Sequence, residues 1–359
     1  SSSSDSSQIL GMKIEKTVQS RWDNEKWKNT EFGSVFSDHM FIVNYKDGHW
    51  QNPHIKEYGP LNILPSLHSL HYGQAIFEGM KAYKGPNDET FLFRPEQNAK
   101  RLNNSAVRMC MPKIPEKMFL DALFELISLD KKWIPNDGTS SLYIRPFMYG
   151  SSNFIKARPS TDYTFIIITC PVQTYYTDEV HVKIELDYTR ASSGGTGAAK
   201  AAGNYGASFY PAKMAQQEGF QQLIWTDGNN HQFIEESGTM NIFFKRNNEL
   251  ITPPLSDSIL PGITRDSIIK LANHNRIECI EEKIDLKEMI RGYESGSISE
   301  AFGVGTAAAV ANITSITHKD QKLEFKLNEN GLAEQLKTNL QNIQFGRSED
   351  PFGWRIKVN

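Results

Sequence analysis

Lys200 is the residue with the clearest chemical potential, because it is the only charged side chain in a run of small residues from Ser193 to Ser208. Glycine and alanine allow a flat ligand to approach the backbone closely. A lysine that loses hydration in such a run is suited to form a Schiff base with a carbonyl group. Ala199 and Ala201 stand where a phosphate-binding P-loop has glycine and then serine or threonine, so the run is not a P-loop. A solvated lysine in a flexible loop is the alternative interpretation.

Two adjacent glutamates are candidates for the acid that would act with this lysine. A lysine that holds pyridoxal phosphate requires an acid partner for the pyridine nitrogen and an anion site for the phosphate. Glu235 and Glu236 end a predicted strand, just before the segment from Ser237 to Asn241. Neighbouring strand residues face opposite ways, so only one of the two can face the ring. These residues leave the choice open, and two exposed glutamates at a strand end are the alternative.

Three further segments offer groups that bind phosphate. The backbone N–H groups of Ile263 and Thr264 open a predicted helix, where free donors and the helix dipole favour an anion. Thr306 lies in a glycine-flanked loop and offers a hydroxyl group. Arg94 offers a guanidinium that can form two parallel hydrogen bonds with a phosphate. Each signal is weak by itself, because many helices begin after Pro-Gly and most arginines are solvated.

Composition limits the class of protein. The chain has 359 residues, of which 39% are hydrophobic, and a formal net charge of −3. This balance gives no reason to expect nucleic acid or a membrane as partner, and no apolar run is long enough to span a bilayer. The three cysteines, Cys110, Cys170 and Cys279, are widely separated and suit a reducing cytoplasm. No histidine or cysteine pair has metal-ligand spacing, so no metal site is expected.

The first half of the chain is predicted to mix helices and strands. Apolar residues at helical spacing predict helices over residues 97–111 and 118–129. Residues 142–149 alternate as a strand, which places Tyr143 and Arg145 on one face. A continuous apolar run over residues 165–170 predicts a buried strand.

The second half contains hairpin signals and further helix starts. The turn sequence Asp-Gly-Asn-Asn at 227–230 separates two predicted strands. Asp285 followed by Glu288 resembles a capping box at the start of a helix. Because helices and strands follow no regular βαβ rhythm, an α+β fold is favoured over a doubly wound one. The elements predicted here are strands over 222–226, 231–235, 241–245 and 249–252, and helices over 263–275, after 285 and over 332–343.

A change in composition after Pro171 predicts two domains. The segment that follows is polar and rich in tyrosine, as is typical of a connection. The predicted organisation is a disordered N-terminal tail (1–11), a small N-terminal α+β domain (12–172), an interdomain loop (173–184) and a large C-terminal cofactor-binding domain (185–359).

Taken together and in this order, the segments resemble the branched-chain amino acid aminotransferases, which are fold-type IV pyridoxal-phosphate enzymes. The resemblance extends from about Phe32 to about Phe345. Its blocks are Phe36-Ser37-Asp38-His39-Met40, Leu70-His71-Tyr72, Phe77-Glu78-Gly79-Met80-Lys81-Ala82, Phe93-Arg94-Pro95, Leu142-Tyr143-Ile144-Arg145-Pro146, Lys200-x-x-Gly203-Asn204-Tyr205, Glu236-x-Gly238-Thr239-Met240-Asn241, Leu260-Pro261-Gly262 and Gly305-Thr306-Ala307.

The resemblance assigns roles to these residues. It implies that Lys200 is the Schiff-base lysine and the general acid and base, and that Glu236, five residues before Asn241, partners the pyridine nitrogen. The cofactor, pyridoxal 5'-phosphate, would be bound by Arg94, Lys200, Tyr205, Glu236, Thr239, Ile263, Thr264 and Thr306. The substrate would be bound by Phe32, Tyr72, Phe77, Tyr143, Arg145, Tyr175, Thr239, Thr306 and Ala307, with Tyr72 supplied to the neighbouring subunit of a homodimer. A lid around Ile155 also maps to the site.

The implied fold is a D-amino acid aminotransferase-like α+β fold, with a smaller N-terminal domain, a larger mixed barrel-like C-terminal domain and the cofactor between them. Animal members of the family carry a CxxC pair where this chain has Ala308 and Ala311, so a thiol–disulfide switch is excluded there.

The implied reaction is a ping-pong transfer of the amino group between L-leucine, L-isoleucine or L-valine and 2-oxoglutarate, giving branched 2-oxo acids and L-glutamate. Arg145 is expected to pair with the γ-carboxylate of glutamate, and neighbouring tyrosine hydroxyls to be its partners when glutamate is absent. A buried strut that never contacts substrate is the other interpretation of Arg145. The competing functions are another enzyme of the same fold group, a D-amino acid aminotransferase or an aminodeoxychorismate lyase, and a non-catalytic cofactor-binding scaffold.

Overall fold

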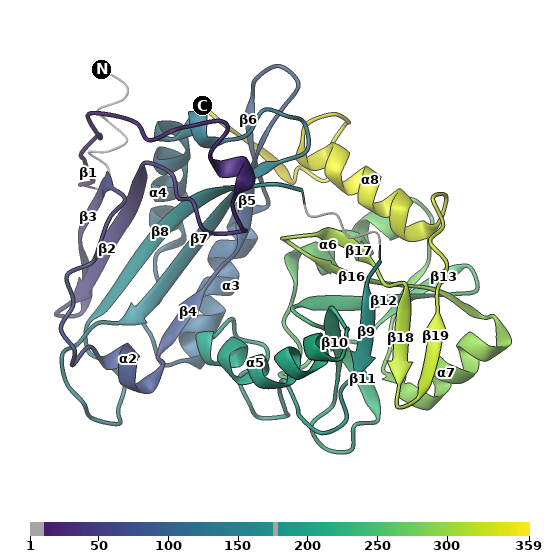
Figure 1. Cartoon of the computed structure of the whole chain (residues 1–359). Helices are drawn as coiled ribbons and strands as arrows, with labels where there is room; N and C mark the ends of the chain where they lie inside the picture. Colours follow the sequence, from purple (N-terminus) through teal and green to yellow (C-terminus); the bar gives the residue numbers. More distant parts are fainter. Residues whose placement is uncertain (1–10, 175–178) are drawn as a thin grey trace. The chain divides into compact units, whose positions relative to one another are not determined.

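The structure is a computed structural model that describes residues 11–174 and 179–359. Its helices and strands form two compact units (Figure 1). The first unit contains the chain up to Thr174, the short segment Ala199–Ala202 and the C-terminal segment Ile343–Asn359. The second unit contains Tyr175–Ala198 and Gly203–Asn342. The predicted N-terminal tail lies outside the described residues, apart from residue 11.

A mixed sheet forms the frame of the first unit. Along the sheet the strands follow the order β1-β3-β2-β8-β7-β5-β6-β20, and β4 also pairs with β7. The strands are β1 (Lys13–Ile14), β2 (His39–Lys46), β3 (His49–Glu57), β4 (Ala75–Phe77), β5 (Met80–Lys84), β6 (Thr90–Phe93), β7 (Ser141–Gly150), β8 (Tyr163–Val172) and β20 (Arg355–Val358).

The two long central strands confirm the patterns expected from the sequence. In β7 the side chains of Leu142, Ile144 and Met148 are fully buried on one face, and Tyr143 and Arg145 lie on the other. The continuous apolar run of β8 pairs with β7 along its whole length. Strand β7 therefore separates a hydrophobic core on one face from a face that carries polar groups.

Two helices cover the core face of this sheet. Helix α3 (Pro95–Arg108) and helix α4 (Glu116–Leu129) confirm the two helices predicted for this half. Leu102 of α3 and Phe119 of α4 pack with Phe165 of β8 in one fully buried cluster. The other helical segments of this unit are η1 (Trp27–Asn29), α2 (His68–Tyr72) and η2 (Lys131–Trp133).

The second unit contains another mixed sheet. Its main path follows the order β14-β13-β12-β11-β10-β9-β18-β19, with β15, β16 and β17 paired beside it. The strands are β9 (His181–Ile184), β10 (Gln222–Thr226), β11 (Phe233–Ser237), β12 (Met240–Arg246), β13 (Glu249–Thr252), β14 (Cys279–Glu281), β15 (Ile284–Asp285), β16 (Ile298–Gly305), β17 (Ala309–Asn312), β18 (Ser315–His318) and β19 (Gln321–Glu324).

Three of the helices in the second part of the chain, those at residues 263, 286 and 332, begin where the sequence predicts. Asp285 caps α7, since its carboxylate accepts hydrogen bonds from the N–H groups of Lys287 and Glu288. Strand β11 begins two residues later than predicted, because the turn includes His231, which has a left-handed φ of 50°. The helices are α5 (Ala202–Gln217), α6 (Ile263–His274), α7 (Leu286–Ser295) and α8 (Leu332–Gln344).

The C-terminal segment differs from the predicted organisation. Residues 185–359 were expected in one domain, whereas residues 343–359 belong to the first unit. Strand β20 extends the first sheet by pairing antiparallel with β6. Trp354 stacks edge-on against Phe93, with ring centroids 5.7 Å apart. No local pattern predicts this return, because β20 is short and its partner strand lies far away in the chain. The predicted domain boundaries otherwise stay a prediction.

Candidate active site

Lys200 belongs to the first unit, although the chain on both sides of its short segment belongs to the second. The backbone N–H of Lys200 donates to the hydroxyl of buried Ser105 at 2.9 Å. Its carbonyl accepts from the N–H of Phe77 at 3.1 Å, next to a bridge between Ile76 and Ala201. The main chain of the lysine is therefore fixed at the end of β4. Its Nζ lies 4.7 Å from the centroid of the Phe77 ring, an apolar neighbour for the amine.

Arg145 lies among aromatic rings on the face of β7 opposite the core. Its guanidinium carbon is 4.3 Å from the centroid of Phe77 and 5.4 Å from that of Tyr143. The Nη2 group donates to the Tyr143 hydroxyl at 3.0 Å, which confirms a tyrosine as partner of this arginine. Phe32 packs edge-on against Tyr143, with centroids 5.1 Å apart. The first unit thus brings together four predicted site residues and places the lysine backbone beside them.

The bonding of Arg145 is incomplete. Its Nε is buried and has no hydrogen-bond partner among the described residues. Within the same residues, no carboxylate forms an ion pair with its guanidinium. A buried polar group without a partner costs about 1–3 kcal/mol, and more for a charged one. The arginine therefore has donor capacity for an anionic group that the described residues do not supply.

Arg94 occupies a strained position at the start of α3. Its φ of 47° is in the left-handed region, where residues other than glycine are uncommon. The N–H of Arg94 donates to the carbonyl of Trp354 at 2.8 Å, and its guanidinium carbon lies 4.9 Å from the Trp354 ring. Pro95 follows as the first helical residue. The buried guanidinium is thus oriented by the C-terminal segment, which the sequence analysis did not connect with it.

Glu236 is buried in the second unit and is paired with an arginine. Its Oε2 lies 2.8 Å from Nη1 of Arg190, and both side chains are less than a tenth exposed. Its Oε1 accepts hydrogen bonds from the N–H of Leu260 at 3.2 Å and from the Asn241 amide at 3.4 Å. This environment stabilises an ionised carboxylate. Glu235 is half-buried and accepts from a serine hydroxyl instead, and burial raises the pKa of its carboxyl.

Arg190 is the residue that the sequence analysis missed. It lies in the loop after β9, and its guanidinium donates to the carbonyls of Ser258 and Gly197, each at 3.1 Å. These bonds fix the guanidinium beside Glu236. No motif predicted this contact, because the residues around Arg190 contain no pattern that indicates a contact with strand β11. The general rule that a buried carboxylate requires a cation was the only available signal.

Helix α6 has a glycine at its N-cap, so the N-cap residue offers no side chain to the first backbone donors of the helix. Its N-cap is Gly262, and the helix begins at Ile263 as the sequence predicts. A Cβ at Gly262 would overlap the side-chain oxygen of Asn241, so glycine is required there by space. Thr264 is buried and Ile263 is half-buried. The first N–H groups of this helix therefore suit an anion, and the positive end of the helix dipole at the same place favours one.

The other predicted residues occupy surface or half-buried positions. Tyr72 ends α2 and is 43% exposed. Thr239 and Ala307 are exposed in turns, and Thr306 and Tyr205 are half-buried. Ile155, in the segment after β7, is 65% exposed. Tyr175 lies outside the described residues, so its predicted role stays a prediction.

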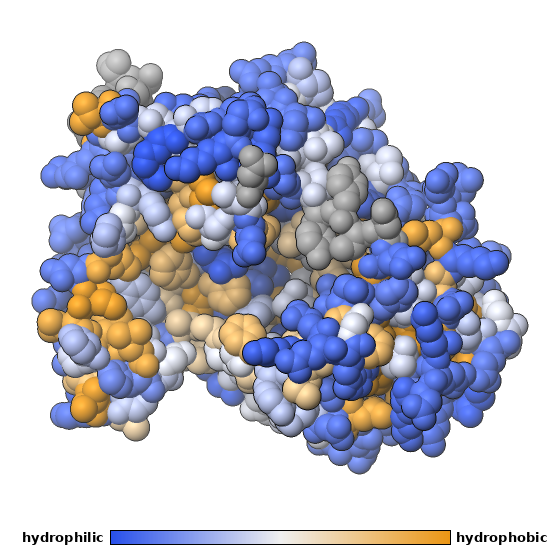
Figure 2. Space-filling model, viewed as in Figure 1, coloured by the Kyte–Doolittle hydropathy of each residue, from blue (hydrophilic) through white to orange (hydrophobic). Residues whose placement is uncertain are grey.

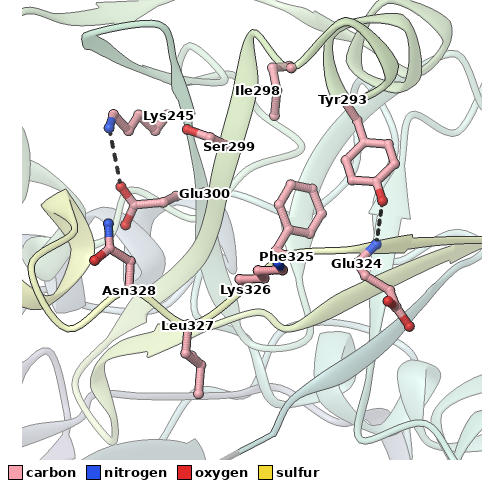
Figure 3. Close-up of a pocket in the computed structure, with 11 residues that line it drawn as sticks. Lys245, Tyr293, Ile298, Ser299, Glu300, Glu324, Phe325, Lys326, Leu327 and Asn328 are labelled. Carbon is pink, nitrogen blue, oxygen red and sulfur yellow. Dashed lines mark hydrogen bonds and ion pairs between the residues drawn. The ribbon is translucent and has the colours of Figure 1, made fainter.

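One cavity of about 530 Å³ lies elsewhere in the second unit (Figure 3). It is lined by residues of β12, α7, β16 and β19 and of the loop that follows β19, and Lys245 and Glu300 form an ion pair at 3.9 Å in its wall. Glu300 also accepts hydrogen bonds from the N–H groups of Leu332 and Ala333 at the start of α8. None of the predicted site residues lines this cavity. Glu324 and Lys326 also line it.

Two searches of the described ranges bear on other kinds of site. Among these residues, no cluster of three or more histidine, cysteine, aspartate or glutamate side chains is placed to hold a metal ion. Within the same ranges, every helix is too short or too polar to cross a bilayer.

Comparison with known proteins identifies the family. The family described as amino-transferase class IV matches residues 75–316. Branched-chain-amino-acid aminotransferase 2 of Bacillus subtilis is 43% identical over 332 residues, which are 91% of this chain and 92% of that protein. The branched-chain aminotransferase of Thermoproteus uzoniensis, solved with norvaline, has a TM-score of 0.74 and 25% identity, covering 89% of this chain and 100% of that one.

The holo-form with pyridoxal phosphate of the Thermobaculum terrenum enzyme has the same fold, with a TM-score of 0.72 at 23% identity over 89% of this chain and 98% of that one. These likenesses confirm the expected α+β, fold-type IV architecture. Through the family match and the identity to its relatives, the chain belongs to the class IV aminotransferases and, within them, to the branched-chain-amino-acid aminotransferases.

Proposed function

We propose that this protein transfers the amino group between L-leucine, L-isoleucine or L-valine and 2-oxoglutarate, with pyridoxal 5'-phosphate as cofactor. The observation that carries the proposal is Arg145, a cation with spare donors on an aromatic face beside the Lys200 backbone. The aromatic rings of such a surface can pack against an alkyl side chain, and its guanidinium can bind a carboxylate. Family membership supports the same substrates.

The residues present fit the cofactor. Pyridoxal phosphate requires a lysine, an ionised acid and an anion site. Lys200 provides the first and Glu236, held beside Arg190, the second. The uncapped start of α6 suits a phosphate, as does the guanidinium of Arg94. The residues proposed to hold the cofactor are Arg94 and Lys200 of the first unit and Tyr205, Glu236, Thr239, Ile263, Thr264 and Thr306 of the second.

When bound, the cofactor supplies a protonated ring that withdraws the electrons left when the substrate loses its α-proton. The Nζ amine of Lys200 takes that proton and later returns it, so it serves as general base and then as general acid. Glu236 keeps a proton on the ring nitrogen, and Arg190 holds Glu236 in its ionised form. The fixed backbone of Lys200 limits the positions that the amine can reach.

The substrate site must accept two unlike side chains in turn. The rings of Phe32, Phe77 and Tyr143, together with Tyr175, suit the branched alkyl group. Arg145 pairs with the γ-carboxylate of glutamate. The Tyr143 hydroxyl satisfies one Arg145 donor when an alkyl group occupies the site. Tyr72, Thr239, Thr306 and Ala307 complete the proposed substrate set.

We also propose a homodimer in the cytoplasm. Apolar side chains gather on the surface around α2 (Figure 2), where Leu64 is 56% and Leu70 is 62% exposed. Tyr72 lies in the same region and would reach the site of a second copy. Exposed apolar surface of this kind marks an interface. Sedimentation of the purified protein tests the dimer, and a Leu70→Glu variant that remains dimeric would argue against this face.

The test of the function is the visible absorption spectrum of the protein with added pyridoxal 5'-phosphate. We expect a yellow band that L-leucine bleaches and 2-oxoglutarate restores. A band that responds to D-alanine and not to L-leucine would instead support a D-amino acid aminotransferase or a related lyase. A bound cofactor that no amino acid converts would support a non-catalytic scaffold.

Arg145→Met tests the assignment of the carboxylate group separately. Methionine keeps much of the volume and removes the charge. We expect turnover of glutamate and 2-oxoglutarate to fall by at least about 100-fold, with the leucine half-reaction retained. An equal loss in both half-reactions would show that Arg145 is a strut rather than a substrate contact.

A further inference from the structure

Gly79 lies directly across the sheet from Arg145. Strands β4 and β5 pair with β7 in one register, with Phe77 opposite Phe147 and Met80 opposite Ile144. The two residues between β4 and β5 therefore face Arg145 and Pro146. Opposite residues of an antiparallel pair point to the same face. The position of Gly79 consequently lies on the face that carries Arg145 and Tyr143.

Glycine is required at this position by space and not by backbone conformation. A Cβ at Gly79 would overlap the hydroxyl oxygen of Tyr143 and lie 3.3 Å from its Cζ. Gly79 is absent from the residues with positive φ, so alanine meets no backbone strain there. The hydroxyl of Tyr143 occupies the volume that a methyl group would fill. Relief of the overlap requires a movement of roughly 1 Å.

The backbone at Gly79 is fixed by a buried polar network. Its carbonyl accepts from the Asn98 amide at 3.1 Å. The neighbouring Glu78 is fully buried and accepts from Nε of Arg101 at 2.9 Å and from Nη2 at 2.7 Å. The N–H of Glu78 donates to the carbonyl of Pro146 at 2.8 Å. Displacement of this turn would break several charged hydrogen bonds, so the tyrosine is the group that must move.

Tyr143 moves only at the expense of its contact with Arg145. The ring is 8% exposed and packs edge-on against Phe32. Its hydroxyl lies 3.0 Å from Nη2 of Arg145, and a displacement of about 1 Å breaks that hydrogen bond. The guanidinium would then lose the partner that orients it.

We propose that Gly79 is a positioning residue for dicarboxylate recognition. Because it has no side chain, it leaves the space in which the Tyr143 hydroxyl bonds Arg145, and this hydrogen bond orients the guanidinium. This inference rests on the proposed function, in which Arg145 binds the γ-carboxylate. It gives a role to the Glu78-Gly79 pair of the sequence block, which the reaction itself does not use. The buried Glu78–Arg101 pair supports the seat and does not contact substrate.

The test is a double-mutant cycle between Gly79→Ala and Tyr143→Phe. In Gly79→Ala, kcat/KM for 2-oxoglutarate should fall by about 10- to 100-fold, as expected for a misplacement of about 1 Å. The value for L-leucine should fall by a smaller factor, because the displaced Tyr143 ring borders both side chains whereas only 2-oxoglutarate also uses the Arg145 guanidinium. In the Tyr143→Phe background the overlapping oxygen is gone and the nearest ring atom lies 3.3 Å from the added Cβ, so Gly79→Ala should have a much smaller effect on either substrate than in the wild-type background. Gly59→Ala is the matched control, since a Cβ there meets no atom within 4 Å.

Unfolding experiments on the same four proteins supply a readout that does not depend on activity. We expect Gly79→Ala to lower stability in the wild-type background and by much less in Tyr143→Phe. Additive effects, or equal losses of both substrates in Gly79→Ala, would overturn the proposal. If Gly79→Ala does not fold, a folded double variant supports the seat, and a double variant that also fails to fold refutes it. A wild-type protein inactive with leucine and 2-oxoglutarate would refute the proposed function alone, because the stability cycle would still report the steric coupling.

Discussion

Arg190→Met is the perturbation that most directly tests the buried pair proposed to serve the cofactor. Methionine preserves much of the volume of the side chain and removes its charge. Glu236 then loses a partner at 2.8 Å in a place where its side chain is only 4% exposed. The Leu260 N–H and the Asn241 amide, which also donate to Glu236, are neutral and lie at 3.2 and 3.4 Å. They replace the cation poorly.

The magnitude follows from this burial. Removal of one member of a buried ion pair leaves an uncompensated charge and destabilises a protein by about 3–5 kcal/mol. The neutral carbonyls of Ser258 and Gly197 lose donors as well, which adds to the loss. Lowering the pH should relieve part of the effect, because a protonated carboxyl group requires no cation.

Urea unfolding of the apoprotein at pH 8 and pH 5, followed by circular dichroism, measures the difference. Hydrogen exchange of peptides from β11 shows whether the loss is local. Glu235→Gln is the matched control, because this neighbouring carboxylate is half-buried and bonds to a serine hydroxyl. We expect the control to change the unfolding free energy by less than about 1 kcal/mol. A loss below about 1 kcal/mol in Arg190→Met, or equal losses in the two variants, would refute the reasoning.

Three further predictions follow from burial and capping. Burial lowers the pKa of Lys81 to about 8, so the protonated amine favours the unfolded state, and the stability of the wild type should rise with pH from about 8 to 10.5. At pH 7, Lys81→Met should be more stable than the wild type by at most about 3 kcal/mol. A stability difference between the two proteins that does not change with pH would contradict this. Burial raises the pKa of the Cys170 thiol to about 11 and that of the half-buried Cys279 to about 12. Iodoacetamide at pH 8 should therefore label exposed Cys110 first. Peptide mapping that finds either of the other two thiols labelled at the same rate would be inconsistent with the structure. Asp285→Ala removes the cap of α7 and should cost about 1 kcal/mol in thermal unfolding, and no change in Tm would show that the cap contributes nothing.

Much of the fold was predictable because its signals are local. Alternation in β7 and helical spacing in α4 repeat within one element, so a short window of sequence contains the information. The N-cap at Asp285 is equally local. The return of β20 to the first sheet was not predictable, since a short strand finds its partner only through the folded chain.

The candidate site likewise has contacts that local sequence patterns predict and contacts that they do not. Alternation placed Tyr143 and Arg145 on one face, and the hydrogen bond between them confirms it. The resemblance chose Glu236 over Glu235, and the structure buries the former while the latter stays half-buried. The roles of these residues stay predictions. The contact between Arg190 and Glu236 could not be predicted, because burial alone requires that pair and burial is a property of the folded unit.

By itself the sequence determined the chemistry that is available: a lysine among small residues, two adjacent glutamates, a helix start that suits an anion and a strand with an arginine on its polar face. These features depend on residue type and on spacing within one element, which the chain specifies directly. Only the tertiary structure decided which groups act on one another. It placed Phe77 beside the Lys200 backbone, Arg190 against Glu236 and the side chain of Tyr143 in the space left by Gly79. Those contacts join residues that are distant in the chain, and they exist because close packing leaves room for one arrangement of side chains.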